Sequence, residues 1–178
     1  MKVIAGKYKG RKIDTIKDLS TRPMLSVARE GIFNSLQFSF ENSEVLDLFA
    51  GSGSMGIEAL SRDAKYVTFI DNSADCINQI KKNLKDYEKR YSVINLDVSN
   101  YISETNSSYD IIFYDPPFEY SSDNVNIDIK ELSGNLSDKG FIVIHRHSNS
   151  PSTVLPKDVE LYKEKNYGQS KILILRKL

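Results

Sequence analysis

Glu44-Val45-Leu46-Asp47-Leu48-Phe49, followed by Ala50-Gly51-Ser52-Gly53-Ser54-Met55-Gly56, is the stretch that decides the fold. The apolar run predicts a buried strand, and the glycines match the pattern G-x-G-x-x-G ahead of a predicted helix that runs to about Arg62. Glycines at such a turn let the backbone approach a ligand closely, and a helix N-terminus favours negative charge. Strand, loop and helix together indicate a ligand-binding unit of an α/β fold.

Strands and helices alternate through the rest of the chain. Four further apolar runs predict strands at Tyr66–Asp71, Ser92–Leu96, Tyr109–Tyr114 and Gly140–Ile144, with helices over residues 73–89, directly after Asp97, and around 127–136. The last segments, Val159–Asn166 and Lys171–Leu175, predict a hairpin around Gly168. This order predicts a mostly parallel, Rossmann-like sheet with helices on both faces and a C-terminal antiparallel hairpin.

An N-terminal extension precedes this body. Val3–Ala5 and Lys12–Ile13 flank the turn Gly6–Gly10 and predict a short β-hairpin. Thr21-Arg22-Pro23-Met24 breaks the chain, and Ser26–Gln37 has the apolar spacing of an amphipathic helix. We therefore divide the chain into an extension, residues 1–40, and a body, residues 41–178. About 40 residues rarely hold a core alone, so the extension is expected to pack on the body.

Composition favours an ordinary globular protein. The chain has 178 residues, of which 40% are hydrophobic and 27% charged. No apolar run approaches the roughly 18 residues of a membrane span, and the N-terminus has no signal-like apolar core. The single cysteine, Cys76, favours a reducing compartment, and no His/Cys cluster has metal-ligand spacing. We expect a cytoplasmic protein without membrane or metal partners.

The basic residues are unevenly distributed although the net charge is zero. The first twelve residues carry five cations and no acid: Lys2, Lys7, Lys9, Arg11 and Lys12. Such an arm could contact phosphates of a nucleic acid without making the whole protein adhesive. The alternative is a solvated surface hairpin without a partner.

Three acids near strand ends point to a nucleoside-containing cofactor. Asp71 lies twenty residues after Gly51 at a strand end, where its carboxylate can accept both ribose hydroxyl protons. Asp47 lies inside the first strand, where burial is costly without a partner. S-adenosylmethionine carries an ammonium group that could be this partner, whereas a nicotinamide dinucleotide has no cation there. Asp97 could accept from the adenine amino group, or it could cap the following helix.

Asp115-Pro116-Pro117-Phe118 follows directly after the strand Tyr109–Tyr114. An exocyclic amino nitrogen of a base is a poor nucleophile because its lone pair is delocalised into the ring. The Asp115 carboxylate and the Pro116 carbonyl could grip its N–H bonds and free the lone pair. The prolines restrict the backbone and lack N–H donors, and Phe118 offers a stacking face for an unstacked base. A proline-rich turn with a core phenylalanine is the alternative.

These motifs together resemble class I S-adenosylmethionine-dependent methyltransferases that act on amino nitrogen. The N-terminus is similar to the RsmD-type 16S ribosomal RNA guanine-N2 methyltransferases. The matching segments are Ile4-Ala5-Gly6, Lys9-Gly10-Arg11, Thr21-Arg22-Pro23, Arg29-Glu30, Ile32-Phe33-Asn34, Leu60-Ser61-Arg62 and Lys82-Asn83-Leu84. The resemblance spans nearly the whole chain. It implies S-adenosylmethionine as cofactor and one guanine of 16S rRNA, within the small ribosomal subunit, as substrate. We expect a monomer.

The expected site has three groups of residues. The catalytic group is Asp115, Pro116, Pro117 and Phe118. The cofactor group is Asp47, Phe49, Ala50, Gly51, Ser52, Gly53, Gly56, Asp71, Asn72, Asp97, Val98 and Asp115. The candidate phosphate contacts of the RNA are Lys7, Lys9, Arg11, Arg22 and Arg29, where Arg29 could instead form a local ion pair.

Two positions depart from the family pattern. His145, followed by Arg146 and His147, stands where such enzymes more often have a glutamate after the fifth strand. Gly31 lies inside the first predicted helix, where alanine is more usual, and should weaken that helix by roughly 1 kcal/mol. We expect neither position to touch the glycine loop or the Asp-Pro-Pro-Phe motif.

Other functions remain as alternatives. A nicotinamide oxidoreductase would explain the glycine loop and Asp71 but not Asp47 or Asp115. A non-catalytic ribosome-assembly factor would have no need of an amino-nitrogen clamp. A DNA adenine-N6 or protein-glutamine methyltransferase could share the Asp-Pro-Pro-aromatic motif, although DNA enzymes usually carry an added recognition domain for which this chain has little room.

Overall fold

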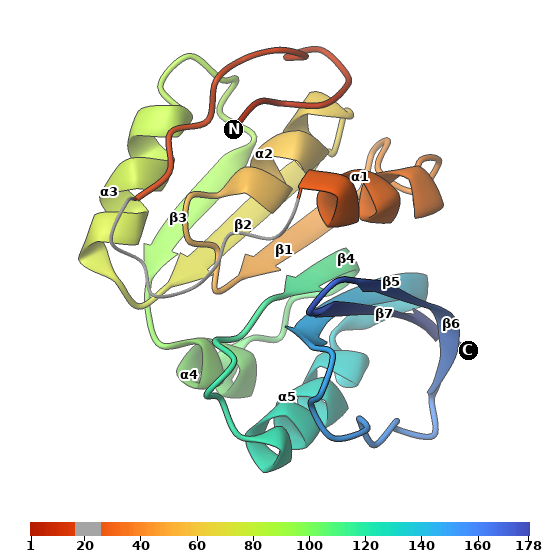
Figure 1. Cartoon of the computed structure of the whole chain (residues 1–178). Coiled ribbons are helices and arrows are strands. Elements are labelled where there is room, and N and C mark those ends of the chain that lie inside the picture. The colour runs from red at the N-terminus through yellow and green to blue at the C-terminus, as the bar shows by residue number, and fades with distance from the viewer. Residues whose placement is uncertain (17–25) are drawn as a thin grey trace.

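The computed structural model describes residues 1–16 and 26–178. Within them, one seven-stranded sheet has the order β3-β2-β1-β4-β5-β7-β6 (Figure 1). The strands are β1 (Glu44–Leu48), β2 (Tyr66–Asp71), β3 (Tyr91–Asn95), β4 (Tyr109–Tyr114), β5 (Leu136–His147), β6 (Val159–Tyr167) and β7 (Ser170–Lys177). The helices are α1 (Ser26–Ser35), α2 (Ser54–Ser61), α3 (Ala74–Asn83), α4 (Val98–Glu104) and α5 (Ser122–Gly134).

The first five strands are parallel, and the last two are antiparallel. β1 pairs with β2 on one side and with β4 on the other, so the chain reverses its winding direction between β1 and β4. β7 runs antiparallel to β5, and β6 runs antiparallel to β7. In open α/β sheets, ligands bind beyond the carboxyl ends of the strands at such a reversal. The predicted α/β sheet and its C-terminal hairpin are confirmed.

Successive strand residues face opposite layers of the molecule. Val45 and Ile111 belong to the core cluster with α1, α2 and α3, whereas Leu46 and Ile112 belong to the cluster with α4 and α5. Figure 1 shows the two helical layers on the two faces of the sheet. The buried parallel strands are therefore apolar on both faces, which is why they read as continuous apolar runs.

The element boundaries differ from the sequence predictions mainly at helix ends. Strands β2 and β4 have the predicted bounds, but α3 ends at Asn83 and not near residue 89. Leu84 caps that helix, and Tyr87 donates its backbone N–H to the Leu84 carbonyl in a turn. Strand β5 is longer than predicted, because it begins at Leu136.

The N-terminal segment is a short hairpin held against the body, in which Lys2 and Lys12 form an antiparallel β-bridge. The Val3 N–H donates to the Arg11 carbonyl at 2.9 Å, and the Ile13 N–H donates to the Met1 carbonyl at 2.8 Å. The predicted short hairpin is therefore confirmed. Val3, Tyr8 and Ile13 are buried in the same core cluster as α2. The boundary near residue 40 stays a prediction, and Thr21–Met24 lie outside the described residues.

Gly31 has a packing role that the sequence did not reveal. A Cβ at this position would lie 1.9 Å from the Tyr167 hydroxyl oxygen and 2.8 Å from Tyr167 Cζ. The glycine in α1 therefore lets the end of β6 approach the helix. No helix in the described residues is both long and apolar enough to cross a membrane.

Candidate active site

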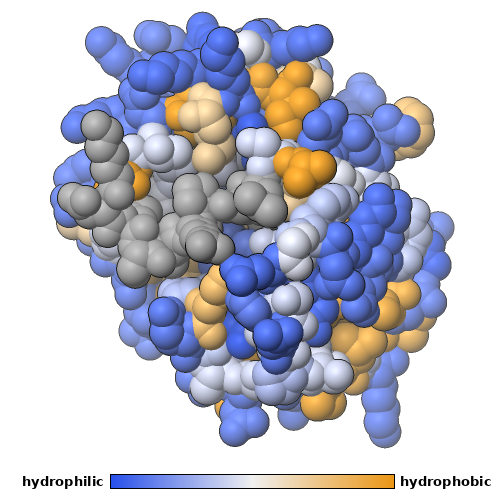
Figure 2. All heavy atoms as spheres, viewed as in Figure 1, coloured by the Kyte–Doolittle hydropathy of each residue, from blue (hydrophilic) through white to orange (hydrophobic). Residues whose placement is uncertain are grey.

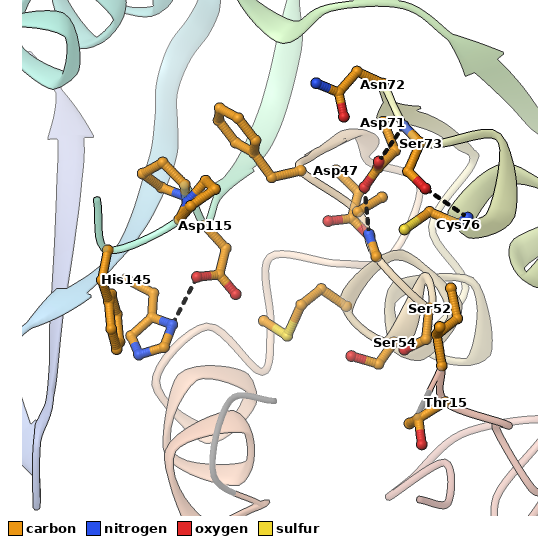
Figure 3. Close-up of a pocket in the computed structure, with 18 of the residues that line it drawn as sticks. Thr15, Asp47, Ser52, Ser54, Asp71, Asn72, Ser73, Cys76, Asp115 and His145 are labelled. Carbon is orange, nitrogen blue, oxygen red and sulfur yellow. Dashed lines mark hydrogen bonds and ion pairs between the residues drawn. The ribbon is translucent and has the colours of Figure 1, made fainter. Parts of the chain in front are cut away.

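A cavity of about 320 Å³ opens at the carboxyl ends of β1, β2 and β4, where the winding of the sheet reverses (Figure 3). Asp115 and His145 lie on one side of it, and Asp71, Asn72 and Cys76 lie on the other. The predicted cofactor residues that line it are Asp47, Phe49, Ala50, Gly51, Ser52, Asp71, Asn72 and Asp115. The predicted catalytic residues line it too. Most of the site residues predicted from the sequence thus line one cavity.

The glycine loop has the left-handed backbone that its glycines allow. Gly51 and Gly53 have φ of 57° and 77°, in the left-handed region that glycine adopts without a Cβ penalty. Phe49 adopts φ 55° although it is not glycine. Asp71 holds the loop in place, because its Oδ2 accepts from the Gly51 N–H at 2.9 Å and its Oδ1 accepts from the Ser73 N–H at 2.9 Å.

Asp47 is a buried acid at the base of the cavity. Asp47 is 3% exposed, and its Oδ2 accepts from the Gly56 N–H at 2.9 Å. Burial raises the pKa of Asp47 well above its usual value, and the neighbouring carboxylates Asp115 and Asp71 raise it further. The Gly56 N–H acts in the opposite direction. A ligand cation would stabilise the ionised carboxylate at this place.

Four predicted cofactor residues lie outside the cavity wall, and each has another role. A Cβ at Gly56 would lie 2.3 Å from Phe69 Cε1, so this glycine serves the packing of α2 on β2. Gly53 is the N-cap of α2, and Val98 is buried in the core. Asp97 caps α4 by accepting from the Asn100 N–H at 3.2 Å, which fits the capping alternative. Contact of these four with a cofactor is not supported by the cavity.

The Asp-Pro-Pro-Phe motif forms the opposite wall. Asp115 Oδ1 lies 2.7 Å from His145 Nδ1, and the Asp115 side chain is 34% exposed. Neither Asp115 Oδ2 nor the Pro116 carbonyl has a hydrogen-bond partner among the described residues. Phe118 is 38% exposed and therefore presents part of its ring to solvent. The two unpartnered acceptors and the partly exposed ring thus belong to three residues that line the cavity.

Buried polar groups fix the loop that carries this motif. The Arg146 guanidinium donates to the Tyr120 carbonyl at 3.0 Å and to the Pro117 carbonyl at 3.5 Å. Asp128 on α5 accepts from the hydroxyls of Tyr114 at 2.6 Å and Tyr120 at 3.1 Å. Sequence reasoning missed these anchors, because a basic residue in β5 and an acid in α5 carry no local signal of their contacts.

The cavity wall is acidic. Four carboxylates line it, those of Asp47, Asp71, Asp115 and Glu119, and among the described lining residues there is no lysine or arginine. Met1 also lines the cavity, and its ammonium group donates to the Ile13 carbonyl at 2.9 Å. Such a wall favours a positively charged ligand over a pyrophosphate.

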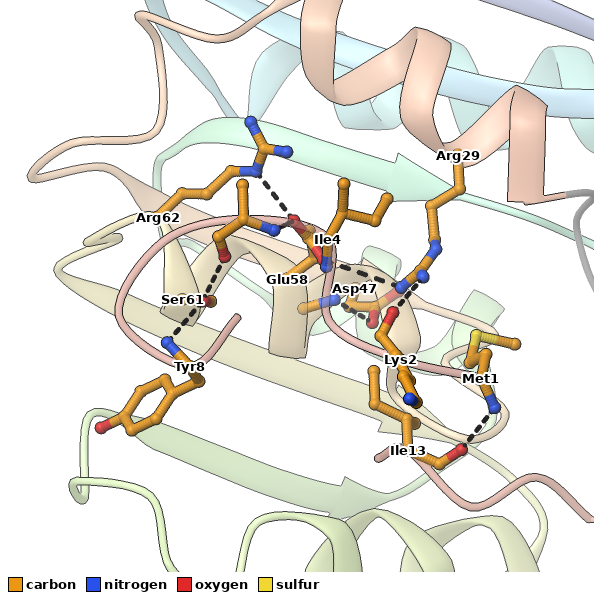
Figure 4. A network of polar contacts seen from close by, with 12 residues as sticks. Met1, Lys2, Ile4, Tyr8, Ile13, Arg29, Asp47, Glu58, Ser61 and Arg62 are labelled. Carbon is orange, nitrogen blue, oxygen red and sulfur yellow. Dashed lines mark hydrogen bonds and ion pairs between the residues drawn. The ribbon is translucent and has the colours of Figure 1, made fainter. Parts of the chain in front are cut away.

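The N-terminal segment completes the cavity through Met1, Thr15 and Ile16. Buried Glu58 on α2 fixes this segment, since it accepts from the N–H groups of Ile4 at 2.7 Å and Ala5 at 3.0 Å (Figure 4). Arg62 Nε donates to the same carboxylate at 3.0 Å, and Arg29 lies 3.8 Å from it. The sequence had not singled out Glu58.

The predicted phosphate contacts separate into three groups. Lys7, Lys9 and Arg11 are exposed, although Lys7 pairs with Glu88 and Arg11 stacks on the rings of Tyr8 and Tyr87. Arg29 is 3% exposed and faces Glu58, so its prediction as a phosphate contact is wrong and the ion-pair alternative fits. Arg22 lies outside the described residues. RNA binding by the other three stays a prediction.

The chain is similar over nearly its whole length to known proteins. The family described as "Conserved hypothetical protein 95" matches residues 1–176. The "Ribosomal RNA small subunit methyltransferase D" of Haemophilus influenzae is 34% identical over 173 residues, which cover 94% of this chain and 89% of that protein. The structure described as "Putative methyltransferase yhhF from Escherichia coli" has a TM-score of 0.89 and 28% identity, and covers 99% of this chain and 97% of its own.

A more distant structure shares the fold alone. It is described as "a putative methyltransferase complexed with SAH", with a TM-score of 0.73 and 15% identity over 85% of this chain and 50% of its own. The class I methyltransferase fold is thereby confirmed, and so is the resemblance drawn from the motifs. The chain belongs to the Conserved hypothetical protein 95 family, together with the Ribosomal RNA small subunit methyltransferase D proteins.

Proposed function

We propose that this protein transfers a methyl group from S-adenosylmethionine to the N2 amino group of a guanine in 16S rRNA within the small ribosomal subunit. The observation that carries the proposal is the pair of unpartnered acceptors, Asp115 Oδ2 and the Pro116 carbonyl, at the mouth of an acidic cavity. The names of the relatives support rRNA as the class of substrate.

The residues of the cavity fit S-adenosylmethionine. Asp71 keeps acceptor capacity for ribose hydroxyls, because an ionised carboxylate offers about four lone-pair sites and each of its oxygens accepts one backbone N–H. Asp47 stands where a buried carboxylate would meet the ammonium of the methionine portion. The acidic wall suits a ligand that carries a sulfonium and an ammonium. When bound, this cofactor would supply an electrophilic methyl group on a positively charged sulfur.

The residues of the Asp-Pro-Pro-Phe motif would prepare the nucleophile. The exposed ring of Phe118 would stack with the unstacked guanine. Asp115 Oδ2 and the Pro116 carbonyl would each accept one N–H of the N2 amino group and hold its lone pair toward the methyl. Acceptors aimed at this nitrogen stabilise the positive charge that develops there, and alignment contributes further rate acceleration. The proton that the nitrogen then loses would pass to Asp115 or to water.

The exposed cations of the N-terminal segment would contact the phosphates of the RNA. Lys2, Lys7, Lys9, Arg11 and Lys12 all lie on the surface, and Figure 2 shows hydrophilic side chains gathered over this part of the molecule. Exposed ion pairs such as Lys7–Glu88 are weak, so RNA phosphate can replace the acid. A small basic area predicts modest affinity for free RNA with strong salt dependence.

The competing functions fit the site less well. A nicotinamide dinucleotide would bring two phosphate charges against four carboxylates without a lysine or arginine in the described wall. A pure assembly factor would have no need of the two unpartnered acceptors. A DNA adenine-N6 or protein-glutamine methyltransferase would use the same clamp, so only the acceptor distinguishes them.

The test is transfer of labelled methyl from S-adenosylmethionine to unmodified small subunits, naked 16S rRNA, duplex DNA and a protein lysate. We expect the wild type to label the subunits. Asp115→Ala should lower the rate of methyl transfer by several orders of magnitude while the affinity for S-adenosylhomocysteine (SAH) stays unchanged. Label in DNA or protein would keep the chemistry and refute the substrate. If no acceptor is labelled although the protein still binds SAH, the proposed methyltransferase activity is refuted.

A further inference from the structure

We propose that His145 is a positioning residue that holds the Asp115 carboxylate in its reactive orientation, with Ser170 fixing the proton of the imidazole. The inference rests on the proposed function, because it assigns a role to His145 in the same transfer reaction. It concerns one of the two positions at which this chain departs from the family pattern. The expectation that His145 does not touch the Asp-Pro-Pro-Phe motif is wrong, because its ring bonds to Asp115 and packs against Phe118.

The contacts of His145 form a short chain of hydrogen bonds. Its Nδ1 lies 2.7 Å from Asp115 Oδ1, and its Nε2 lies 2.9 Å from the Ser170 hydroxyl oxygen. His145 is 2% exposed and Ser170 is 8% exposed, so water competes little for either bond. A buried chain of this kind has few alternative arrangements.

These two hydrogen bonds determine which ring nitrogen of His145 carries the proton. An ionised Asp115 can only accept, so Nδ1 must donate to it. In the neutral imidazole, Nε2 is then the acceptor, and the Ser170 hydroxyl can donate to it. Both contacts therefore agree with a single tautomer, in which the Nδ1 proton faces Asp115. The second ring contact of a histidine commonly sets its tautomer in this way.

The two oxygens of Asp115 therefore have different roles. Oδ1 is occupied by His145, while Oδ2 has no partner among the described residues and lines the cavity mouth. Without the His145 bond, the partly exposed carboxylate could rotate about its side-chain torsions, since it has no other hydrogen bond within the described ranges 1–16 and 26–178. A misplaced acceptor lowers the rate of transfer more than it lowers the binding of the cofactor.

His147 offers a matched control on the same strand. Both histidine rings pack edge-on against Phe118, with centroid separations of 5.6 Å for His145 and 5.4 Å for His147. Only His145 bonds to Asp115, whereas His147 Nδ1 accepts from the Asn149 N–H. A comparison of His145→Leu with His147→Leu therefore separates the bond to Asp115 from contact with the phenyl ring.

The experiment measures kcat, the KM for S-adenosylmethionine and the Kd for SAH in the full chain. We expect His145→Leu to lower kcat by about 10- to 100-fold while the cofactor KM and the SAH Kd stay within about two-fold. His147→Leu should change kcat by no more than about three-fold. His145→Asn, whose amide nitrogen can reach the place of Nδ1, should recover at least half of the logarithmic loss.

A double-mutant cycle tests whether His145 acts through Asp115. In an Asp115→Ala background, measured by single turnover, His145→Leu should cause no further loss. Equal loss in both backgrounds, equal loss in the two leucine variants, or wild-type kcat in His145→Leu would each overturn the proposal. If His145→Leu fails to bind SAH, ¹⁵N chemical shifts of the wild-type ring decide. A protonated Nδ1 supports the proposal, and an Nδ1 without a proton overturns it.

The design also separates this proposal from the proposed function. If the wild type transfers no methyl group to small subunits, the proposed function fails before any variant is compared. If the wild type is active and His145→Leu matches it, only the role of His145 fails.

Discussion

Asp47→Asn should stabilise the ligand-free protein while weakening the binding of the cofactor. The buried carboxylate has a raised pKa, whereas in the unfolded chain it ionises near its ordinary value of 3.8. The folded state therefore keeps a proton that the unfolded state loses. The stabilisation from Asp47 is complete below about pH 4 and declines as the pH rises toward the folded-state pKa.

Linkage gives the size of this effect. Within that window, Asp47 lowers the free energy of unfolding by about 1.4 kcal/mol for each pH unit. The asparagine does not titrate and can still accept from the Gly56 N–H, so the slope should be smaller by that amount in the variant. Urea unfolding of both proteins at several pH values above pH 4 measures the difference, in which the contributions of the other carboxylates cancel.

Cofactor binding should show the opposite sign. If the ammonium of SAH meets Asp47, the loss of one charged hydrogen bond costs about 1.5–3 kcal/mol, which is about a 10- to 150-fold increase in Kd. Calorimetric titration with SAH at pH 7 measures it. With saturating SAH the wild-type slope should approach that of the variant, because the ammonium keeps Asp47 ionised. Equal SAH affinity in the two proteins would refute this assignment of the ammonium.

Three further predictions concern packing, the N-terminal segment and the RNA. Gly31→Ala should lower the free energy of unfolding by about 1–2 kcal/mol, since overpacking against Tyr167 exceeds the gain in helix propensity. In a Tyr167→Ala background the same substitution should stabilise the protein by about 0.5–1 kcal/mol. Urea unfolding measures both effects. Glu58→Ala should cost about 3–5 kcal/mol and speed amide exchange at Ala5, whereas exchange as slow as in the wild type would contradict the role of Glu58. Lys9→Glu should raise the KM for small subunits and reduce the salt slope of binding by about one counterion, at unchanged SAH affinity; an unchanged slope would exclude Lys9 as a phosphate contact.

The sheet was predictable because its strands are buried on both faces. Apart from Asp47, the residues of Val45–Leu48 and Ile111–Tyr114 have apolar or aromatic side chains toward both helical layers, so their runs stand out from the sequence. The order of elements then implies the parallel sheet. The N-terminal hairpin was predictable from its turn, but not the packing of Val3 and Ile13 into the core beside α2, because their partners are distant in the sequence.

The site was predictable where one residue type has one local function. Gly51 and Asp115 follow strand ends, and sequence alone places such residues beside a ligand. The burial of Arg29 against Glu58 and the packing of Gly56 on Phe69 were not predictable, because each partner lies on another element. The bond between His145 and Asp115 depends on the pairing of β4 with β5, which no local pattern reveals.

The most direct test of the amino-nitrogen clamp is the chemical identity of the product. Small subunits methylated in vitro by the wild type would be digested to nucleosides and analysed by mass spectrometry against authentic standards. The proposed clamp of Asp115 and the Pro116 carbonyl predicts a methyl group on an exocyclic amino nitrogen. With guanine as the proposed substrate, the new nucleoside should be N2-methylguanosine, absent with Asp115→Ala. A methyl group on a ribose oxygen, a ring carbon or a ring nitrogen would contradict the account, because none of these atoms presents two N–H bonds to grip.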